Sequence, residues 1–347
     1  MRRIIQERGL LLPQYVNGPS LVYVVQGSQS RSQSQRDQYQ KVQQIREGYV
    51  VGLPTGVPKW VYNNGLYPLV LVTVVDTNNR ANQQDRNARR SEYERGERGQ
   101  SQRPSEQQYG SENVFSGLDE RLLAEVFNVN TDLARKLSGE EDYRGIIVRL
   151  YGGLEVLNPQ QSPEGEQHTG SSGSGRYNGV EETFCTLRLQ HNVNDPSQAG
   201  VFNPRAGRVT NVNSNNLPVL TRLQLSVQKG VHYRGIGQVQ MVDDNGNTVF
   251  DGWFRRVKFL TAPQNYGVVK RASAAGLEWV SFKTNDNART SQLAGQVSVI
   301  RAMPVDVVAN SYQVSMEEAR RLKENRLEVT MLSPWSRSRY SITQGSD

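Results

Sequence analysis

One segment of this chain occurs twice, and the repeat restricts the possible folds more than any other feature. Residues 127–137 align without gaps to residues 312–322. Both copies follow the pattern aromatic, any, Val, Asn or Ser, any, acidic, any, Ala, Arg, basic, Leu. An internal repeat over such a separation indicates one architecture that is built twice along the chain.

Each copy of the repeat carries the signature of a helix start. Asn130 and Ser315 stand where an N-cap side chain accepts the first free amide of a helix. Ser315 is followed three residues later by Glu318, which completes a capping box. The sequence therefore predicts a helical pair in each half of the chain.

The remaining ordered segments are typical of short strands. They are rich in Val, Leu and aromatic residues and are bounded by Pro, Gly or Asn. Asn245 and Gly246 separate two of these segments and predict a tight hairpin turn. The expected strands are residues 10–12, 21–25, 49–53, 69–75, 239–242, 248–250, 258–260 and 277–283. The fold class is thus mainly antiparallel β, with a helical pair closing each half.

Three segments of low complexity interrupt the strands, at residues 27–44, 77–113 and 158–179. None has apolar periodicity, so we expect mobile surface segments there. They predict an N-terminal domain of residues 1–157 with disordered inserts near 27–44 and 78–114, a linker of residues 158–178, and a C-terminal domain of residues 179–347.

The composition favours a store of nitrogen over a binding surface. The chain has 33 Arg against 8 Lys, together with 30 Gln and 26 Asn. Gln- and Arg-rich tracts are also typical of disordered linkers, so that alternative stays open. The net charge of +7 suits nucleic acid, but the Arg residues are interleaved with Glu and no basic block with regular aromatics occurs. We expect no nucleic-acid partner, and no apolar run is long enough to predict a membrane span.

Metal-ligating residues are scarce. Cys185 is the single cysteine, which excludes an internal disulfide and a Cys-based zinc site. His168, His191 and His232 lie far apart in the sequence. Cys185 could act as a nucleophile, but no motif arranges a His and Asn pair or a His and Asp pair with it, so we expect no catalytic residue and no metal site.

Several motifs nevertheless resemble a known family. The spacing Gly48-(five)-Pro54-x-Gly56-(two)-Lys59-(three)-Asn63 is similar to the second motif of cupins. Residues 178–185 resemble the junction between the acidic and basic chains of 11S seed storage globulins, of the legumin and glutelin type. Further segments resemble that family closely, at residues 243–252, 263–266, 281–285 and 328–336.

The resemblance implies a bicupin fold, which is two β-barrel jelly rolls each followed by a short helical extension. It implies a non-catalytic nutrient reservoir without a cofactor, assembled as trimers and hexamers and mobilised by proteolysis at germination. It also implies transport through the secretory pathway to the protein storage vacuole, although the chain begins without an apolar run of signal-peptide length.

The resemblance further implies that a vacuolar processing protease cuts the bond between Asn178 and Gly179. The preceding Ser- and Gly-rich residues 171–177 suit a protease, which needs an extended and accessible segment. In the family, the position of Cys185 bridges the two processed chains. The segments that carry the partner cysteine are missing here, so Cys185 has no visible partner.

Two departures bear on fold and activity. Near residues 229–235 the family has a strand pair that this chain lacks, which leaves open whether the second barrel is complete. In the cupin motif the metal-binding His is replaced by Lys59, and the aligned position in the second half falls near Val268. A cation repels a divalent metal, so the sequence predicts a protein that is not an enzyme. A metal-dependent or small-ligand-binding cupin is the alternative.

Overall fold

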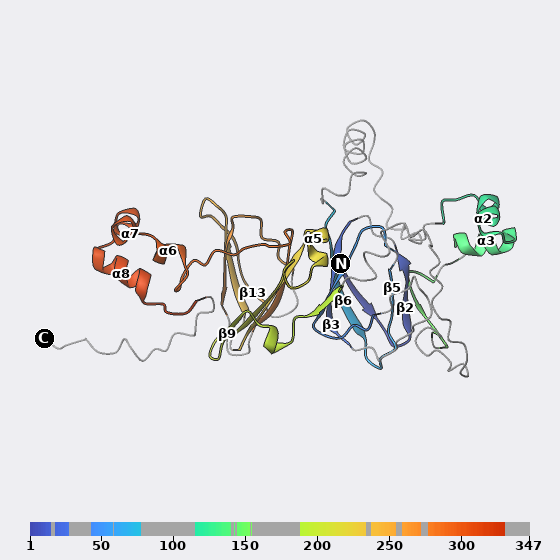
Figure 1. The fold of residues 1–347 in the computed structure, drawn as a ribbon, viewed down its shortest axis with the longest axis horizontal. Helices are drawn as coiled ribbons and strands as arrows, with labels where there is room; N and C mark the ends of the chain where they lie inside the picture. Colours follow the sequence, from blue (N-terminus) through green and yellow to red (C-terminus); the bar gives the residue numbers. More distant parts are fainter. Residues whose placement is uncertain are drawn as a thin grey trace, which may run out of the picture. The chain divides into compact units, whose positions relative to one another are not determined.

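The computed structural model describes residues 1–14, 18–27, 43–57, 59–77, 115–139, 142, 144–152, 154, 188–233, 237–254, 259–271 and 277–329. The chain divides into two compact units (Figure 1). The first unit comprises residues 1–194, 213–225 and 284–286, and the second comprises residues 195–212, 226–283 and 287–347. The predicted linker at residues 158–178 lies outside the described residues.

The first unit contains two antiparallel sheets. One has the order β1 (Arg2–Ile5), β6 (Leu69–Val75), β3 (Ser20–Gln26), β4 (Tyr49–Leu53) and β8 (Gln190–Asn192). The other has the order β5 (Lys59–Tyr62), β2 (Gly9–Gln14) and β7 (Ile147–Arg149). These strands confirm the sequence expectations at residues 10–12, 21–25, 49–53 and 69–75.

The two sheets pack face to face around one apolar core. Ile5, Val24 and Leu69 of the larger sheet are fully buried, and Leu11 of the smaller sheet joins the same cluster. Burial of each such side chain contributes roughly 1.5–3 kcal/mol. Pro13 is tolerated within β2 because the pairing register shifts between Leu11 and Gln14, so its missing N–H falls at an irregularity.

The second unit also contains two antiparallel sheets. One has the order β15 (Leu277–Lys283), β11 (Ser226–His232), β10 (Gly207–Val212) and β9 (Val201–Asn203). The other has the order β13 (Thr248–Phe254), β12 (Gly237–Val242) and β14 (Gly267–Arg271). The predicted hairpin is confirmed: β12 and β13 pair, and Gly246 between them has φ of 84°.

The two units differ in how they enclose their central strands. In the first unit β6 has a neighbour on each side, and its first five residues are buried. Among the described strands of the second unit, β15 pairs with β11 alone, and none of its residues is fully buried. Gly230 lies within β11, which pairs with β10 on one side and β15 on the other. The chain near the missing strand pair thus continues as a strand, and β15 becomes a sheet edge.

The strand expected at residues 258–260 is not formed. Lys258 lies outside the described residues, and Phe259 and Leu260 are exposed and outside any strand. Local β propensity does not suffice there, because a strand also needs a paired neighbour with a buried face.

The predicted helical pairs are both present. They are α2 (Glu120–Phe127) with α3 (Thr131–Ser138), and α7 (Val305–Tyr312) with α8 (Met316–Glu324). Asn128 and Gln313 end the first helix of each pair in the left-handed conformation, with φ of 51° and 53°. In both pairs the repeat therefore encodes the same turn between helices.

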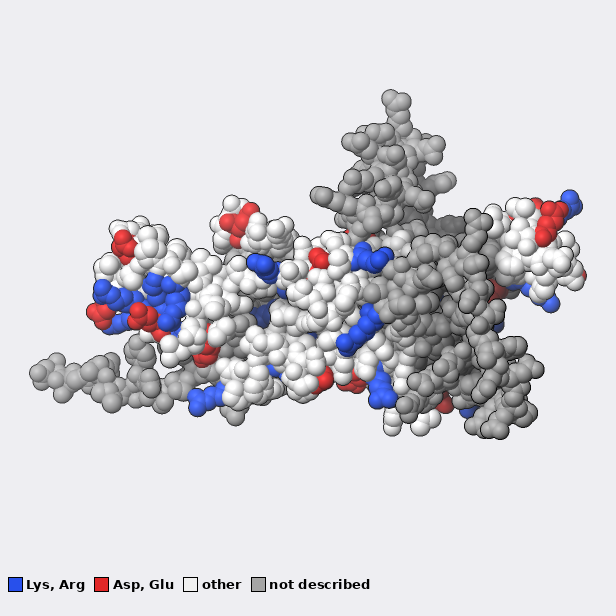
Figure 2. All heavy atoms as spheres, viewed as in Figure 1, with Lys and Arg blue, Asp and Glu red and all other residues white. Residues whose placement is uncertain are grey.

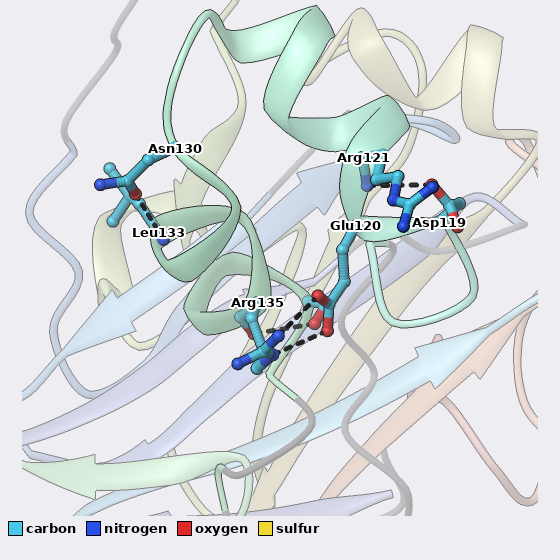
Figure 3. A network of polar contacts seen from close by, with 7 residues as sticks. Asp119, Glu120, Arg121, Asn130, Leu133 and Arg135 are labelled. Atoms are coloured by element: carbon cyan, nitrogen blue, oxygen red, sulfur yellow. Dashed lines mark hydrogen bonds and ion pairs between the residues drawn. The ribbon is translucent and has the colours of Figure 1, made fainter.

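The caps follow the sequence prediction. Oδ1 of Asn130 accepts the amide of Leu133 at 2.9 Å, and Glu120 and Arg135 form an ion pair between α2 and α3 (Figure 3). Ser315 and Glu318 make both hydrogen bonds of the capping box at α8. The other helices among the described residues are short: η2 (Pro196–Gln198), α5 (Val219–Leu223) and α6 (Val299–Ala302).

Candidate functional sites in the two sandwiches

The glycines of the cupin-like motif shape turns. Gly48 has φ of 83°, and a Cβ at this position would lie 2.3 Å from Cγ of Asn194. Gly56 has φ of 75° with open space around it. A residue with a side chain would be strained at both positions, and at Gly48 it would also collide with Asn194. In this chain the two glycines of the motif therefore allow backbone turns that a residue with a side chain would strain.

Asn63, the last residue of the motif, joins the two sheets of the first unit. Its side chain is buried, and Nδ2 donates hydrogen bonds of 2.9 Å to the carbonyls of Ile5 and Tyr67. Its Oδ1 accepts the amide of Gly65 at 3.0 Å. A buried amide with this many partners stabilises one conformation of the segment between β5 and β6.

The metal-ligand position of the first unit holds a cation. Nζ of Lys59 lies 3.4 Å from Oγ of Ser20 on the facing sheet, and Lys59 stands opposite Gln14 in the strand register. Nη1 of Arg3 donates to Oε1 of Gln14 at 2.5 Å. Two basic groups, an amide and a hydroxyl do not form a donor set for a divalent metal, which prefers imidazole, thiolate or carboxylate.

The corresponding position of the second unit is apolar. Val268 lies on β14 opposite Met241 of β12, and Val239 shares their face. In the parts of the chain that the structure describes, no three His, Cys, Asp or Glu residues come together as a metal site.

The two histidines that the structure describes lie in different units of the fold. His191 lies buried on β8, with Nδ1 3.4 Å from the guanidinium of Arg188. His232 ends β11 in the second unit. His168 lies outside the described residues, as do the predicted processing residues Asn178 and Gly179 and the thiol of Cys185.

A group of basic side chains in the second unit was missed at the sequence level. Lys270 follows Val268 by two residues on β14, so both side chains face the interior. Burial, and then the charge of Lys283, lower the pKa of Lys270 to about 8. Burial also lowers the pKa of Lys283, and burial together with Lys270 lowers the pKa of His232. Strand periodicity could have placed Lys270 inside, but its contact with the ring of Trp279 joins β14 to β15, and no local pattern encodes that contact.

The surface offers no continuous basic stripe on the face that Figure 2 shows. Lys and Arg side chains gather around α7 and α8 together with acidic ones, and elsewhere on this face they lie scattered among uncharged side chains. Over the described residues of this face, such mixing gives little of the cumulative phosphate attraction on which nucleic-acid binding depends. No helix among the described residues is long and apolar enough to cross a membrane.

The chain matches the family model described as Cupin over residues 1–93, 191–235 and 230–320. The second half is matched in two pieces that meet at residues 230–235, where the sequence predicts a missing strand pair. The match thus covers most strands of both units.

Curated relatives have similar sequences along almost the whole chain. "11S globulin seed storage protein 1" of Carya illinoinensis is 40% identical, covering 98% of this chain and 84% of its own length. "Glutelin type-A 1" of Oryza sativa subsp. japonica is 40% identical, covering 94% of this chain and 78% of its own length. The Carya alignment runs over 424 positions, so at least 77 of them have no residue among the 347 of this chain.

Solved structures of the same group have the same fold. The coconut allergen cocosin superposes with a TM-score of 0.78 at 40% identity, covering 96% of this chain and 89% of that chain. Procruciferin, the 11S globulin of Brassica napus, superposes with a TM-score of 0.77 at 31% identity, covering 96% and 88%. Together with the duplicated sandwiches, these similarities show that the chain belongs to the cupin family and, within it, to the 11S seed storage globulins.

Proposed function

We propose that this chain acts in the seed as a reservoir of nitrogen and carbon, without catalytic activity and without a bound cofactor. The seed storage role follows from the family. The absence of catalysis is supported chiefly by Lys59, which occupies the position where cupins place a metal-binding His. The large share of Arg, Asn and Gln fits a protein that is consumed as nitrogen.

Metal analysis tests this proposal against the metal-dependent alternative. The protein is purified without chelators and analysed for Mn, Fe, Cu and Zn by plasma mass spectrometry. We expect far less than one metal ion per chain, because the donor set around Lys59 is cationic. A stoichiometric transition metal that survives dialysis would contradict the proposal.

We further propose that copies of the chain associate through their helical pairs, giving the trimers and hexamers implied by the family. Leu122 and Phe127 of the first pair are half-exposed, and so are Val307 and Tyr312 at the equivalent positions of the second pair. Apolar side chains exposed together on a helical pair are typical of a surface that packs against another protein. Equivalent faces at both ends of the repeat suit a closed ring, in which each pair meets the neighbouring copy.

A third part of the proposal concerns processing and location. We propose that the chain reaches the protein storage vacuole and is cut there after Asn178 by a processing protease. Residues 171–177 are rich in Ser and Gly, a composition that suits protease access. Cys185 is the single cysteine of these 347 residues, so no disulfide among them would join the two products.

Incubation of the full chain with an asparagine-specific endopeptidase tests the cleavage. We expect two products, residues 1–178 and 179–347, and we expect Asn178→Gln to prevent their formation. Asn245→Gln is the matched control, because Asn245 also precedes a glycine but lies in the β12–β13 turn. Cleavage that persists in Asn178→Gln at the same position, or that occurs first at Asn245, would refute this assignment.

A further inference from the structure

A groove lies in the second unit beside the turn between β9 and β10. It has a volume of about 440 Å³ and is lined by residues 202–205, which end β9 and begin the turn, and by Leu327 and Glu328, which follow α8. Phe202 and Leu327 are both largely exposed. An open groove that presents an aromatic and an aliphatic side chain is a candidate surface for another protein.

Local hydrogen bonds fix both walls of the groove. Oδ1 of Asn203 accepts the amides of Arg205 at 2.9 Å and of Ala206 at 3.1 Å, which holds the turn in one conformation. On the other wall, the carbonyl of Glu328 accepts the amide of Gln296 at 2.8 Å. The groove is therefore preformed, and a partner that enters it does not have to order the backbone first.

The two walls of the groove differ in charge. The guanidinium of Arg205 is exposed and forms no ion pair within the part of the chain that the structure describes. The carboxylate of Glu328 is partly buried and lies 3.6 Å from Nη1 of Arg326. Arg205 is thus the cation at the groove that is available to an acidic group of a partner.

Helix α2 of the first unit carries a pattern that complements the groove. Leu122 and Val126 lie one turn apart on the same face, and both are exposed. Glu125 borders this face three residues after Leu122, and among the described residues it forms no ion pair. The helix start is fixed, because Oδ1 of Asp119 accepts the amide of Arg121 at 2.9 Å (Figure 3). A rigid helix therefore presents two aliphatic side chains with a carboxylate beside them.

The equivalent helix of the second pair lacks this pattern. Between the two copies of the repeat, Glu125 corresponds to Asn310 of α7 and Val126 corresponds to Ser311. These differences remove the negative charge and the second aliphatic side chain from the helix face. The groove therefore suits α2 and not α7.

We propose that the groove of one copy receives α2 of a neighbouring copy, with Glu125 of the helix paired to Arg205 of the groove. The aliphatic side chains of α2 then cover Phe202 and Leu327. This inference rests on the proposed association and names the surface that receives the first helical pair. Binding of an amphipathic helix in an apolar groove through side chains four residues apart is a common mode of recognition.

The proposed contact also determines the symmetry of the assembly. Each chain has one α2 and one such groove, and they belong to different units. The contact is therefore heterologous, and repetition of a heterologous contact closes into a ring when the rotation permits it. A contact of this kind gives trimers without a stable twofold dimer as an intermediate.

A charge-swap experiment on the full chain tests the contact, with the dissociation constant of the assembly measured by sedimentation over a range of concentrations. We expect Arg205→Glu and Glu125→Arg each to raise the dissociation constant per contact by at least about tenfold, because like charges then face each other. The double variant should recover most of the loss. Arg289→Glu and Asp244→Arg are the matched controls, because they reverse exposed charges that belong neither to the groove nor to α2.

The outcomes separate this inference from the proposed association. If the unsubstituted chain stays monomeric at every concentration, the association itself fails and this contact fails with it. If the chain associates but both single variants associate as tightly as the controls, the groove is not the surface that receives α2. A double variant that associates no better than the single variants would likewise overturn the pairing of Glu125 with Arg205. Recovery in the double variant also shows that the single variants did not lose association through unfolding.

Discussion

Lys270 is a basic residue whose side chain is largely buried in the folded chain, and burial disfavours its positive charge. Its ordinary pKa is 10.5, and burial together with Lys283 lowers the pKa to about 8 in the folded chain. Between these two values the unfolded chain binds the proton more tightly than the folded chain does. The free energy of unfolding therefore rises with pH from about 8 to about 10.5, and the penalty is fully present below pH 8.

We therefore predict that Lys270→Met stabilises the second unit at pH 7. The gain should be on the order of 2 kcal/mol, because the buried charge disappears and methionine packs beside Val268 and Met241. Urea unfolding at pH 7 and at pH 9.5 measures it, and the rise in stability with pH should be smaller than in the original chain. Lys136, an exposed lysine of α3, is the control site. An equal rise in Lys270→Met and in Lys136→Met would contradict the origin assigned to it.

Gly230 is a second residue on which the packing of the second unit depends, because the ring of Trp279 lies against it. Gly230→Ala places a Cβ 2.3 Å from Cε2 of Trp279, and this clash should destabilise the second unit by about 1–3 kcal/mol. Gly200→Ala is the control, because its Cβ would lie 3.9 Å from the nearest neighbour, Nδ2 of Asn211. The midpoints of urea unfolding compare the two variants. Equal urea midpoints for the two variants would show that the ring of Trp279 does not pack tightly against Gly230.

At the scale of elements, local signals were sufficient for the helices and insufficient for the second sheet. The caps at Asn130 and Ser315 depend on side chains within three residues, so the sequence alone located α3 and α8. The segment at 258–260 has the same β propensity as a true strand but lacks a partner. The pairing of β11 with β15 joins segments fifty residues apart, and no local pattern encodes it.

The candidate sites divide in the same way. Lys59 could be assigned from motif spacing, because the motif is contiguous and its glycines fix the turn. The buried position of Lys270 could not, since Lys270 and the ring of Trp279 that it contacts belong to two strands that no local pattern brings together.

The capping box of α8 gives a prediction at this scale. Ser315→Ala removes the hydroxyl that accepts the amide of Glu318, which should cost about 1 kcal/mol of local helix stability. Hydrogen exchange of the amides of α8 should accelerate by about fivefold, as measured by mass spectrometry. Ser311→Ala, at an exposed position near the end of α7, is the matched control. Equal exchange in both variants would show that the cap does not stabilise α8.

At the scale of the whole molecule, the two helical pairs are expected to hold the assembly together. We predict that the full chain sediments as a trimer of its 39.0 kDa protomer or a multiple of it. Leu122→Asp combined with Val307→Asp should give monomers, because each change buries a carboxylate in the proposed contact. Leu66→Asp, at an exposed apolar residue outside the helices, should sediment like the original chain. A monomer for the original chain at micromolar concentration would refute association.

The proposed role of this chain is to be stored in the seed and then consumed. Quantitative mass spectrometry of seeds, from filling through germination, tests that description most directly. We predict that the chain accumulates during filling, is recovered from mature seeds cut after Asn178, and falls to a small fraction of its amount as the seedling grows. An amount that stays constant through germination would contradict the storage account.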